Sequence, residues 1–252
     1  TSVGTMTHGK LFAYQTSGDI KQPVECHFVT NGIGKEKTLT FALGVYDRTR
    51  PLVIDPLIYS TYIGGNNPSS THDVATGVQV DAAGYAYVTG YTNASGFPTM
   101  SGAYRTYPAG GGTGFNAFVA KLYLNGDDLE YLTVLGGGSG DDIARDIAMD
   151  FSNNPYITGY TSSSTFPTLN AYDASYNGGA WDVFVTKLNN DGTLTGTAYS
   201  TYLGGDDVDK AYAIDVQAGN AYITGYSNST TASYPVTTGA FDIQGDGAGD
   251  VI

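Results

Sequence analysis

The side chains that recur in positions suited to chemistry are aspartates. One aspartate stands just before an apolar run in three parts of the chain, at Asp73, Asp142 and Asp209. Further acids crowd the same loops at Asp141, Asp206 and Asp207. Carboxylate oxygens are the ligands that Ca²⁺ prefers, so these loops could bind calcium. An aspartate that accepts backbone N–H bonds and shapes a turn would recur in the same way. Because no loop has the DxDxDG spacing with a distal glutamate, the pattern favours the turn role and keeps calcium as the alternative.

Residues outside this pattern form no recognisable catalytic set. The candidates are His8, Cys26, His27, His72, Arg145 and Trp181. They show no triad, zinc-ligand spacing or nucleophile elbow, so we predict no catalytic residue and no required cofactor, with Ca²⁺ as the one candidate ion. Trp181 could stack on a sugar ring or could pack in a core between repeated units. The single cysteine, Cys26, is expected to be a buried, inert thiol.

Two further pairs of residues carry weaker signals. Asn93 and Asn228 each begin an N-x-Ser/Thr sequence, the acceptor pattern for N-linked glycans, and both follow a similar strand end. Lys121 and Lys187 each close an apolar run. A charge in that place suggests a strand edge that must not pair further, so we expect an edge role for both lysines.

The overall charge limits the partners that the chain could have. It contains 24 acidic and 11 basic side chains, which gives a formal net charge of −13. Such a field repels phosphate backbones and anionic lipid, so nucleic-acid binding is excluded. No apolar run approaches the ~18 residues of a membrane span, so no membrane insertion is expected. The acidic excess suits a protein that works outside the cell or binds cations.

The elements that must position these residues are repeated. The motif YSTYIGG at 59–65 returns as YLTVLGG at 131–137 and as YSTYLGG at 199–205. A second motif, YVTGY or YITGY, stands at 87–91, 156–160 and 222–226. Each unit of about 70 residues contains four short runs with strand-type alternation, joined by turn residues. The Asp-Gly pair in 189–192 lies between two apolar runs and predicts a hairpin.

Four short strands in each repeated unit predict an all-β fold of β-propeller blades. A β-sandwich would not explain a repeat of this length, and a β-helix repeats in shorter rungs. We expect blades at 57–129, 130–197 and 198–252, the last of them incomplete, after a small antiparallel β segment at 1–56. Within that segment we expect strands at 11–15, 23–31 and 38–47, and Pro51 and Pro56 suggest a stiff connector or an edge strand.

The repeats resemble a known family. The stretch RPLVIDPLIYSTYIGG at 50–65, followed by AYVTGYT, FPT and DVFVTKLN motifs, is similar to the SBBP-type β-propeller repeat family, whose repeats commonly follow an uncharacterised β-rich domain. The resemblance implies a bacterial or archaeal protein that is exported or surface-associated. Three blades do not close a ring of ~4 to 8, so further blades of a longer parent chain or other copies are expected as partners.

Two classes of function follow from these observations. The first is a non-enzymatic, extracellular or cell-surface propeller that serves as a structural or binding module in adhesion, a matrix or a filament, with a glycan or a surface protein as a partner. Calcium could stabilise it. The alternative is a propeller enzyme that acts on extracellular polysaccharide, which would require two carboxylates ~5–10 Å apart in one cleft.

Overall fold

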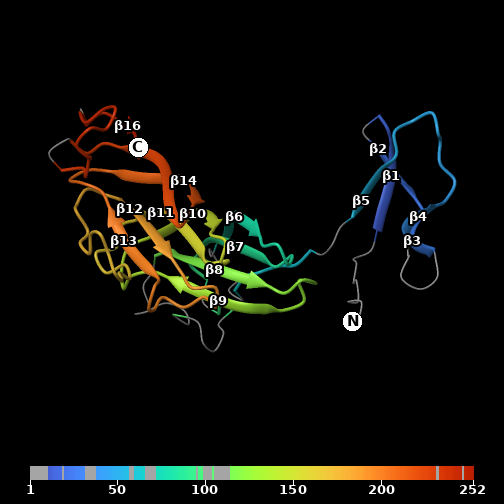
Figure 1. Ribbon diagram of the computed structural model, residues 1–252, viewed down its shortest axis with the longest axis horizontal. Helices are drawn as coiled ribbons and strands as arrows, with labels where there is room; N and C mark the ends of the chain where they lie inside the picture. The colour runs from blue at the N-terminus through green and yellow to red at the C-terminus, as the bar shows by residue number, and fades with distance from the viewer. Residues whose placement is uncertain are drawn as a thin grey trace. The chain divides into compact units, whose positions relative to one another are not determined.

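The computed structural model divides the chain into two compact units, Thr1–Thr61 and Tyr62–Ile252 (Figure 1). It describes residues 11–18, 20–31, 38–56, 60–65, 72–94, 96–98, 104, 114–230, 233–245 and 247–252. All regular elements among these residues are β-strands that pair antiparallel, and no helix in this part of the chain could cross a membrane. The predicted all-β class is confirmed.

The described residues of the first unit form five strands in two small sheets. One sheet has the order β2-β1-β5, formed by β1 (Leu11–Ser17), β2 (Ile20–Val24) and β5 (Val53–Pro56). The other pairs β3 (Cys26–Asn31) with β4 (Thr38–Leu43). The run expected as one strand at 23–31 therefore breaks at Glu25 and enters both sheets. The edge position of β5 agrees with the prolines at 51 and 56.

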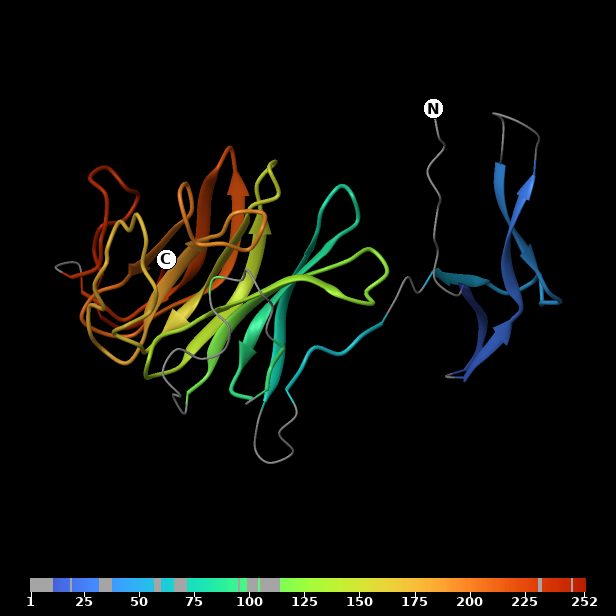
Figure 2. The same cartoon turned by 90° about the horizontal axis from the view of Figure 1, so that it is seen from below.

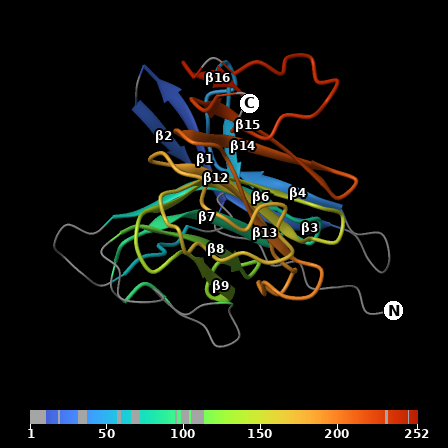
Figure 3. The ribbon, with the colours of Figure 1, turned by 90° about the vertical axis from the view of Figure 1, so that its left-hand side faces the viewer.

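The second unit is built from three antiparallel sheets that follow one another along the chain (Figure 2). Sheet I consists of β6 (Asp73–Val80), β7 (Ala86–Thr92), β8 (Asn116–Leu122) and β9 (Leu129–Leu135). Sheet II consists of β10 (Asp142–Met149), β11 (Pro155–Thr161), β12 (Asp182–Lys187) and β13 (Tyr199–Leu203). Sheet III consists of β14 (Asp209–Gln217), β15 (Asn220–Ser227) and β16 (Asp250–Val251). The described residues between β15 and β16 form turns and loops beside sheet III (Figure 3).

The sequence repeat and the sheets are offset by one strand. The second and third copies of the Tyr/Thr-rich motif form β9 and β13, and these strands pair with β8 and β12, which belong to the preceding sequence repeat. The predicted units 57–129 and 130–197 therefore separate each sheet from its last strand. The hairpin expected at 189–192 is the connection between β12 and β13, and Gly192 closes its turn by donating its N–H to the Asn189 carbonyl at 2.9 Å.

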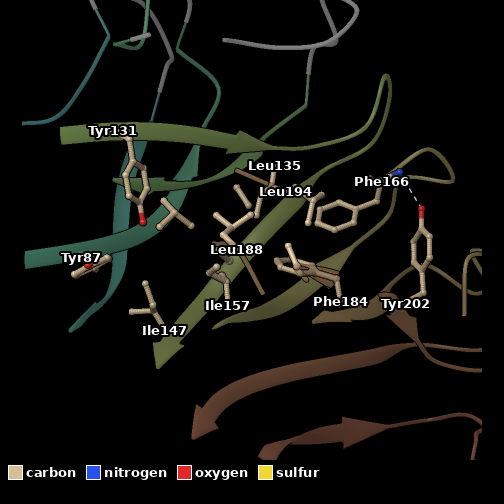
Figure 4. Close-up of a cluster of buried hydrophobic side chains, with 14 residues drawn as sticks. Tyr87, Tyr131, Leu135, Ile147, Ile157, Phe166, Phe184, Leu188, Leu194 and Tyr202 are labelled. Atoms are coloured by element: carbon tan, nitrogen blue, oxygen red, sulfur yellow. Dashed lines mark hydrogen bonds between the residues drawn. The ribbon is translucent and has the colours of Figure 1, made fainter. Parts of the chain in front are cut away.

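Neighbouring sheets pack face to face, with the first strand of each sheet against the sheet before it. β10 contacts β6, β7 and β8, and β14 contacts β10, β11 and β12. The core between sheets I and II gathers aromatic and aliphatic side chains from both (Figure 4), with the Phe166 N–H donating to the Tyr202 hydroxyl at 2.9 Å. A smaller core lies between sheets II and III. Burial of each large apolar side chain contributes about 1.5–3 kcal/mol, so these cores hold the sheets in sequence order.

A β-bulge recurs at one point in the first strand of every sheet. The pairing shifts between Ala75 and Gly77, between Ala144 and Asp146, and between Ala211 and Ala213. The glycine of each Thr-Gly-Tyr motif lies opposite this shift. A Cβ on Gly159, for example, would overlap the Ile143 carbonyl oxygen, so the bulged strand passes too close for any side chain. The bulged residues are Thr76, Arg145 and Tyr212.

Candidate functional site

The recurring polar residues gather at one edge of the three sheets, which we call the rim. The first strand of each sheet starts at this edge, the second ends there and the third starts there, because consecutive strands are antiparallel. Asp73, Asp142 and Asp209 are the first residues of β6, β10 and β14. We call these three residues the rim aspartates.

Each rim aspartate joins the same two groups of its own repeat. In sheet II, Asp142 Oδ1 accepts a hydrogen bond from the Thr161 hydroxyl at 2.5 Å, and Oδ2 accepts one from the Gly137 N–H at 2.9 Å. Asp73 accepts from the Thr92 hydroxyl at 2.5 Å and from the Gly65 N–H at 3.0 Å. Each carboxylate thus ties the end of the second strand to the Gly-Gly loop before the first.

Asp209 repeats this arrangement with one more donor. It accepts hydrogen bonds from the Ser227 hydroxyl, from the Gly205 N–H at 2.8 Å and from the Ser229 hydroxyl at 2.9 Å. Asp142 and Asp209 are fully buried, whereas Asp73 is exposed. Since both oxygens of each rim aspartate accept hydrogen bonds, the geometry supports the turn role for all three.

The additional acids also shape loops. Asp141 Oδ1 accepts the Phe115 N–H at 2.8 Å, and Asp207 Oδ1 accepts the Val208 N–H at 2.7 Å. Asp206 accepts the Ser233 hydroxyl, and this hydrogen bond lowers the pKa of the Asp206 carboxyl. Within the described part of the chain, no three His, Cys, Asp or Glu side chains converge on a metal position. Calcium binding stays a prediction that a solution experiment must test.

The rim also holds a buried acid, Asp182, that was not among the predicted site residues. Asp182 begins β12 with no exposed surface, and its Oδ1 has no hydrogen-bond partner among the described residues. Its Oδ2 accepts the Asn177 N–H at 2.6 Å. A Cβ on Gly204 would lie 2.9 Å from Asp182 Oδ1 and 3.0 Å from Asp209 Oδ2, so the two carboxylates flank the same glycine.

This environment makes Asp182 hard to ionise. Burial raises the pKa of the Asp182 carboxyl to about 7, although the Asn177 N–H acts to lower it, and the charges of Asp209 and Asp173 raise it further. The sequence signal was the acid in DVFVTKL where the preceding repeat has Asn116 in NAFVAKL. Only burial shows that this acid differs from the others.

The two predicted glycan acceptors, Asn93 and Asn228, both form hydrogen bonds at the rim. The Asn93 side-chain oxygen accepts the His72 N–H at 2.8 Å, while Ser95 of its acceptor sequence lies outside the described residues. The Asn228 backbone N–H bonds the Val208 carbonyl at 2.8 Å. Glycan attachment at either asparagine stays a prediction.

The edge role expected for the two lysines is wrong. Lys121 and Lys187 lie in β8 and β12, which pair on both sides, and their ammonium groups pair with Glu130 at 3.1 Å and Asp150 at 3.4 Å. Antiparallel neighbours on both sides leave no edge for these charges to protect.

An aromatic cavity of about 370 Å³ opens at the rim where the three sheets meet. Its aromatic lining comes from the Thr-Gly-Tyr tyrosines and from the residues that precede the third strands, namely Tyr91, Phe115, Tyr160 and Trp181. Tyr91 stands edge-on to Phe115 with ring centroids 5.2 Å apart, and Tyr160 stands edge-on to Trp181 at 5.0 Å. Lys210, Asp141 and His72 provide its polar groups. We call this feature the rim cavity.

The rim cavity brings together several residues that lie apart in the sequence. His72 and Trp181, from different repeats, both line it. Trp181 is half-buried at the cavity wall, which agrees with both of its expected roles. Among the lining residues Asp141 is the one carboxylate, so within the described residues the paired acids of a glycoside hydrolase do not meet here.

Comparison with known families agrees with this architecture. Residues 1–57 match a domain of unknown function (DUF7948), and residues 58–98 and 130–167 match the Beta-propeller repeat (SBBP). The sheets and the matches define an all-β protein built from propeller-like blades. The chain thus contains SBBP β-propeller repeats preceded by a DUF7948 domain, which confirms the resemblance seen in its motifs. No curated protein matches it.

Proposed function

We propose that the chain is a non-enzymatic propeller module that works outside the cell, in adhesion, a matrix or a filament, by joining equivalent sheets and binding a ligand at the rim. The strong acidic charge and the family resemblance support the extracellular setting. Calcium could add stability at the rim loops. The structural part of the proposal rests on one observation. Residues that are buried between neighbouring sheets have equivalents on the two outer sheets, and these equivalents are exposed.

Three equivalent residues define one of these surfaces. Val78, Ile147 and Ile214 each stand three positions after the alanine at the bulge. Ile147 and Ile214 are 1% and 7% exposed because each packs on the preceding sheet, whereas Val78 is 61% exposed. Sheet I therefore presents a face suited to a preceding sheet.

The opposite end of the stack presents the complementary surface. Tyr87 and Tyr156 are fully buried in the two cores between sheets, while their equivalent Tyr222 is 57% exposed. Exposed apolar faces of this kind mark association sites. Further repeats of a parent chain, or sheet III of another copy, would cover the Val78 face with contacts that the molecule already uses twice.

Sedimentation velocity of the full chain tests this proposal. We expect association that increases with concentration, and we expect Val78→Asp to abolish it while Val45→Asp, at an exposed position in the first unit, leaves it intact. A chain that stays monomeric at every concentration would contradict the proposal. Turnover of a polysaccharide panel that is lost in Asp141→Asn would support the enzyme alternative instead.

A further inference from the structure

Lys210 lines the rim cavity, and a second cation, Arg145, lies beside it. Lys210 Nζ lies 4.6 Å from the ring centroid of Tyr160 and 4.9 Å from that of Trp181. The Arg145 guanidinium lies 5.4 Å from the ring centroid of Tyr212. Neither cation forms a salt bridge with any described acid. In contrast, Lys121 and Lys187 also lie over tyrosine rings, and each has a carboxylate partner.

Positive charge is concentrated here against the charge of the whole chain. Burial lowers the pKa of the Lys210 ammonium, and the neighbouring Arg145 charge lowers it further. Two cations that repel each other and form no salt bridge with a described acid favour an external anion, even in a protein of net charge −13. The bulge at Arg145 is what turns its side chain toward Tyr212 of the next sheet.

The remaining walls suit a ring with one apolar face and several hydroxyl groups. Tyr91, Phe115, Tyr160 and Trp181 are all half-buried, so each keeps part of its ring open to the cavity. The cavity volume of about 370 Å³ falls within the ~300–1,000 Å³ typical of small-molecule sites. Asp141 and His72 also line the cavity, where a carboxylate can accept hydroxyl protons.

We propose that the rim cavity binds the carboxylate-bearing sugar unit of an acidic glycan. The sugar ring stacks on Trp181 and Tyr160, and its hydroxyls bond Asp141 and His72. Its carboxylate pairs with Lys210, while Arg145 adds positive charge from beside the cavity. This inference deepens the proposed role as a binding module and rests on it.

Trp181 provides a direct measurement of binding. It is the single tryptophan of the chain, so fluorescence excited selectively at tryptophan reports on the rim cavity. The full chain is titrated with oligogalacturonate and with the methyl ester of the same oligosaccharide, which keeps the ring and removes the charge. We expect oligogalacturonate to bind about tenfold more tightly than its methyl ester, which is the value of one charge-assisted hydrogen bond. We also expect the affinity for oligogalacturonate to fall as the salt concentration rises.

Charge-removing variants identify the residues. Lys210→Gln should reduce acid binding about tenfold, which removes the preference over the ester, and should leave ester binding unchanged. Arg145→Gln removes a charge beside the cavity and should reduce acid binding by a smaller factor, again without effect on the ester. Lys21→Gln is the matched control, because Lys21 also lies over a tyrosine ring, 4.3 Å from that of Tyr14, but in the first unit. Thermal melts establish that the variants fold. If Lys210→Gln does not fold, the effect of Arg145→Gln on acid binding tests the proposal instead.

Equal affinity for acid and ester, or no fluorescence response to either, would overturn the proposal. Sedimentation separates this failure from failure of the proposed function. If the chain associates through the Val78 face but binds neither oligosaccharide, the proposed structural role is retained and the proposed glycan site is rejected.

Discussion

Asp182 of β12 occupies the position that Asn116 holds in β8. Each residue begins the third strand of its sheet, and each side-chain oxygen lies against the first glycine of the next Gly-Gly pair. Both side chains are buried. The rim aspartate of sheet II thus has a neutral amide from sheet I beside it, whereas the rim aspartate of sheet III has a second carboxyl group from sheet II beside it. The Asp182 carboxyl group is neutral, like the Asn116 amide, only when the carboxyl group is protonated.

The stability of the folded chain should therefore depend on pH through Asp182. The folded pKa of about 7 lies above the ordinary value of 3.8, so the folded state holds a proton that the unfolded state releases. The contribution is fully present below pH 4 and is lost as the pH rises toward 7. Asp182→Asn should remove this decline and raise the free energy of unfolding at pH 8 by about 4 kcal/mol, measured by urea titration at several pH values.

The reciprocal substitution is the control. Asn116→Asp should introduce a similar decline into sheet I, because it creates the same pair of carboxyl groups beside Asp142. If the difference between Asp182→Asn and the wild type is the same at pH 4 and pH 8, the carboxyl is not held protonated by the fold.

Loss of a rim aspartate should be costly where the residue is buried. Asp142→Ala leaves the Thr161 hydroxyl and the Gly137 N–H without their acceptor in a buried site, which should destabilise the chain by about 2–4 kcal/mol. Asp73→Ala removes the equivalent bonds at an exposed site, where water replaces the carboxylate, and should cost about 1 kcal/mol or less. Equal losses in chemical denaturation would show that these hydrogen bonds do not set the difference.

Substitution of the Thr-Gly-Tyr glycine should disrupt the bulge. Gly159→Ala places a methyl group against the Ile143 carbonyl and should lower stability by about 3 kcal/mol or more. Gly196→Ala is the control, because no atom lies within 4 Å of its added Cβ and only its φ of 59° opposes the change, at a cost of about 1 kcal/mol. Thermal melts that rank the two variants in the opposite order would contradict the role of the close approach.

Removal of calcium should leave the melting temperature unchanged. The rim aspartates already accept hydrogen bonds at both oxygens, so the rim loops have their donors without an ion. Melting curves are compared in excess chelator and in millimolar Ca²⁺. A rise in melting temperature with Ca²⁺ that Asp206→Asn or Asp141→Asn reduces would establish an ion at the rim and revive the calcium alternative.

The repeated motifs determined the architecture without any structure. Four alternating runs in each unit of about 70 residues are enough to predict four-stranded antiparallel sheets, because strand periodicity and turn residues are local properties. The same motifs carried the family resemblance. They also placed the rim aspartates correctly at equivalent loops, since a turn that recurs needs the same acceptor each time.

The tertiary structure decided what depends on neighbours that are distant in sequence. The partner of β9 is β8 rather than a strand of its own repeat, and β8 is central, so Lys121 is no edge charge. The sequence shows Asp182 as one acid among 24 acidic side chains, yet only burial beside Asp209 raises its pKa. The rim cavity has the same origin, because pairing registers and packing between sheets bring Trp181, Lys210 and Asp141 together. Local patterns fix strands, whereas desolvation and proximity exist only once the sheets have packed.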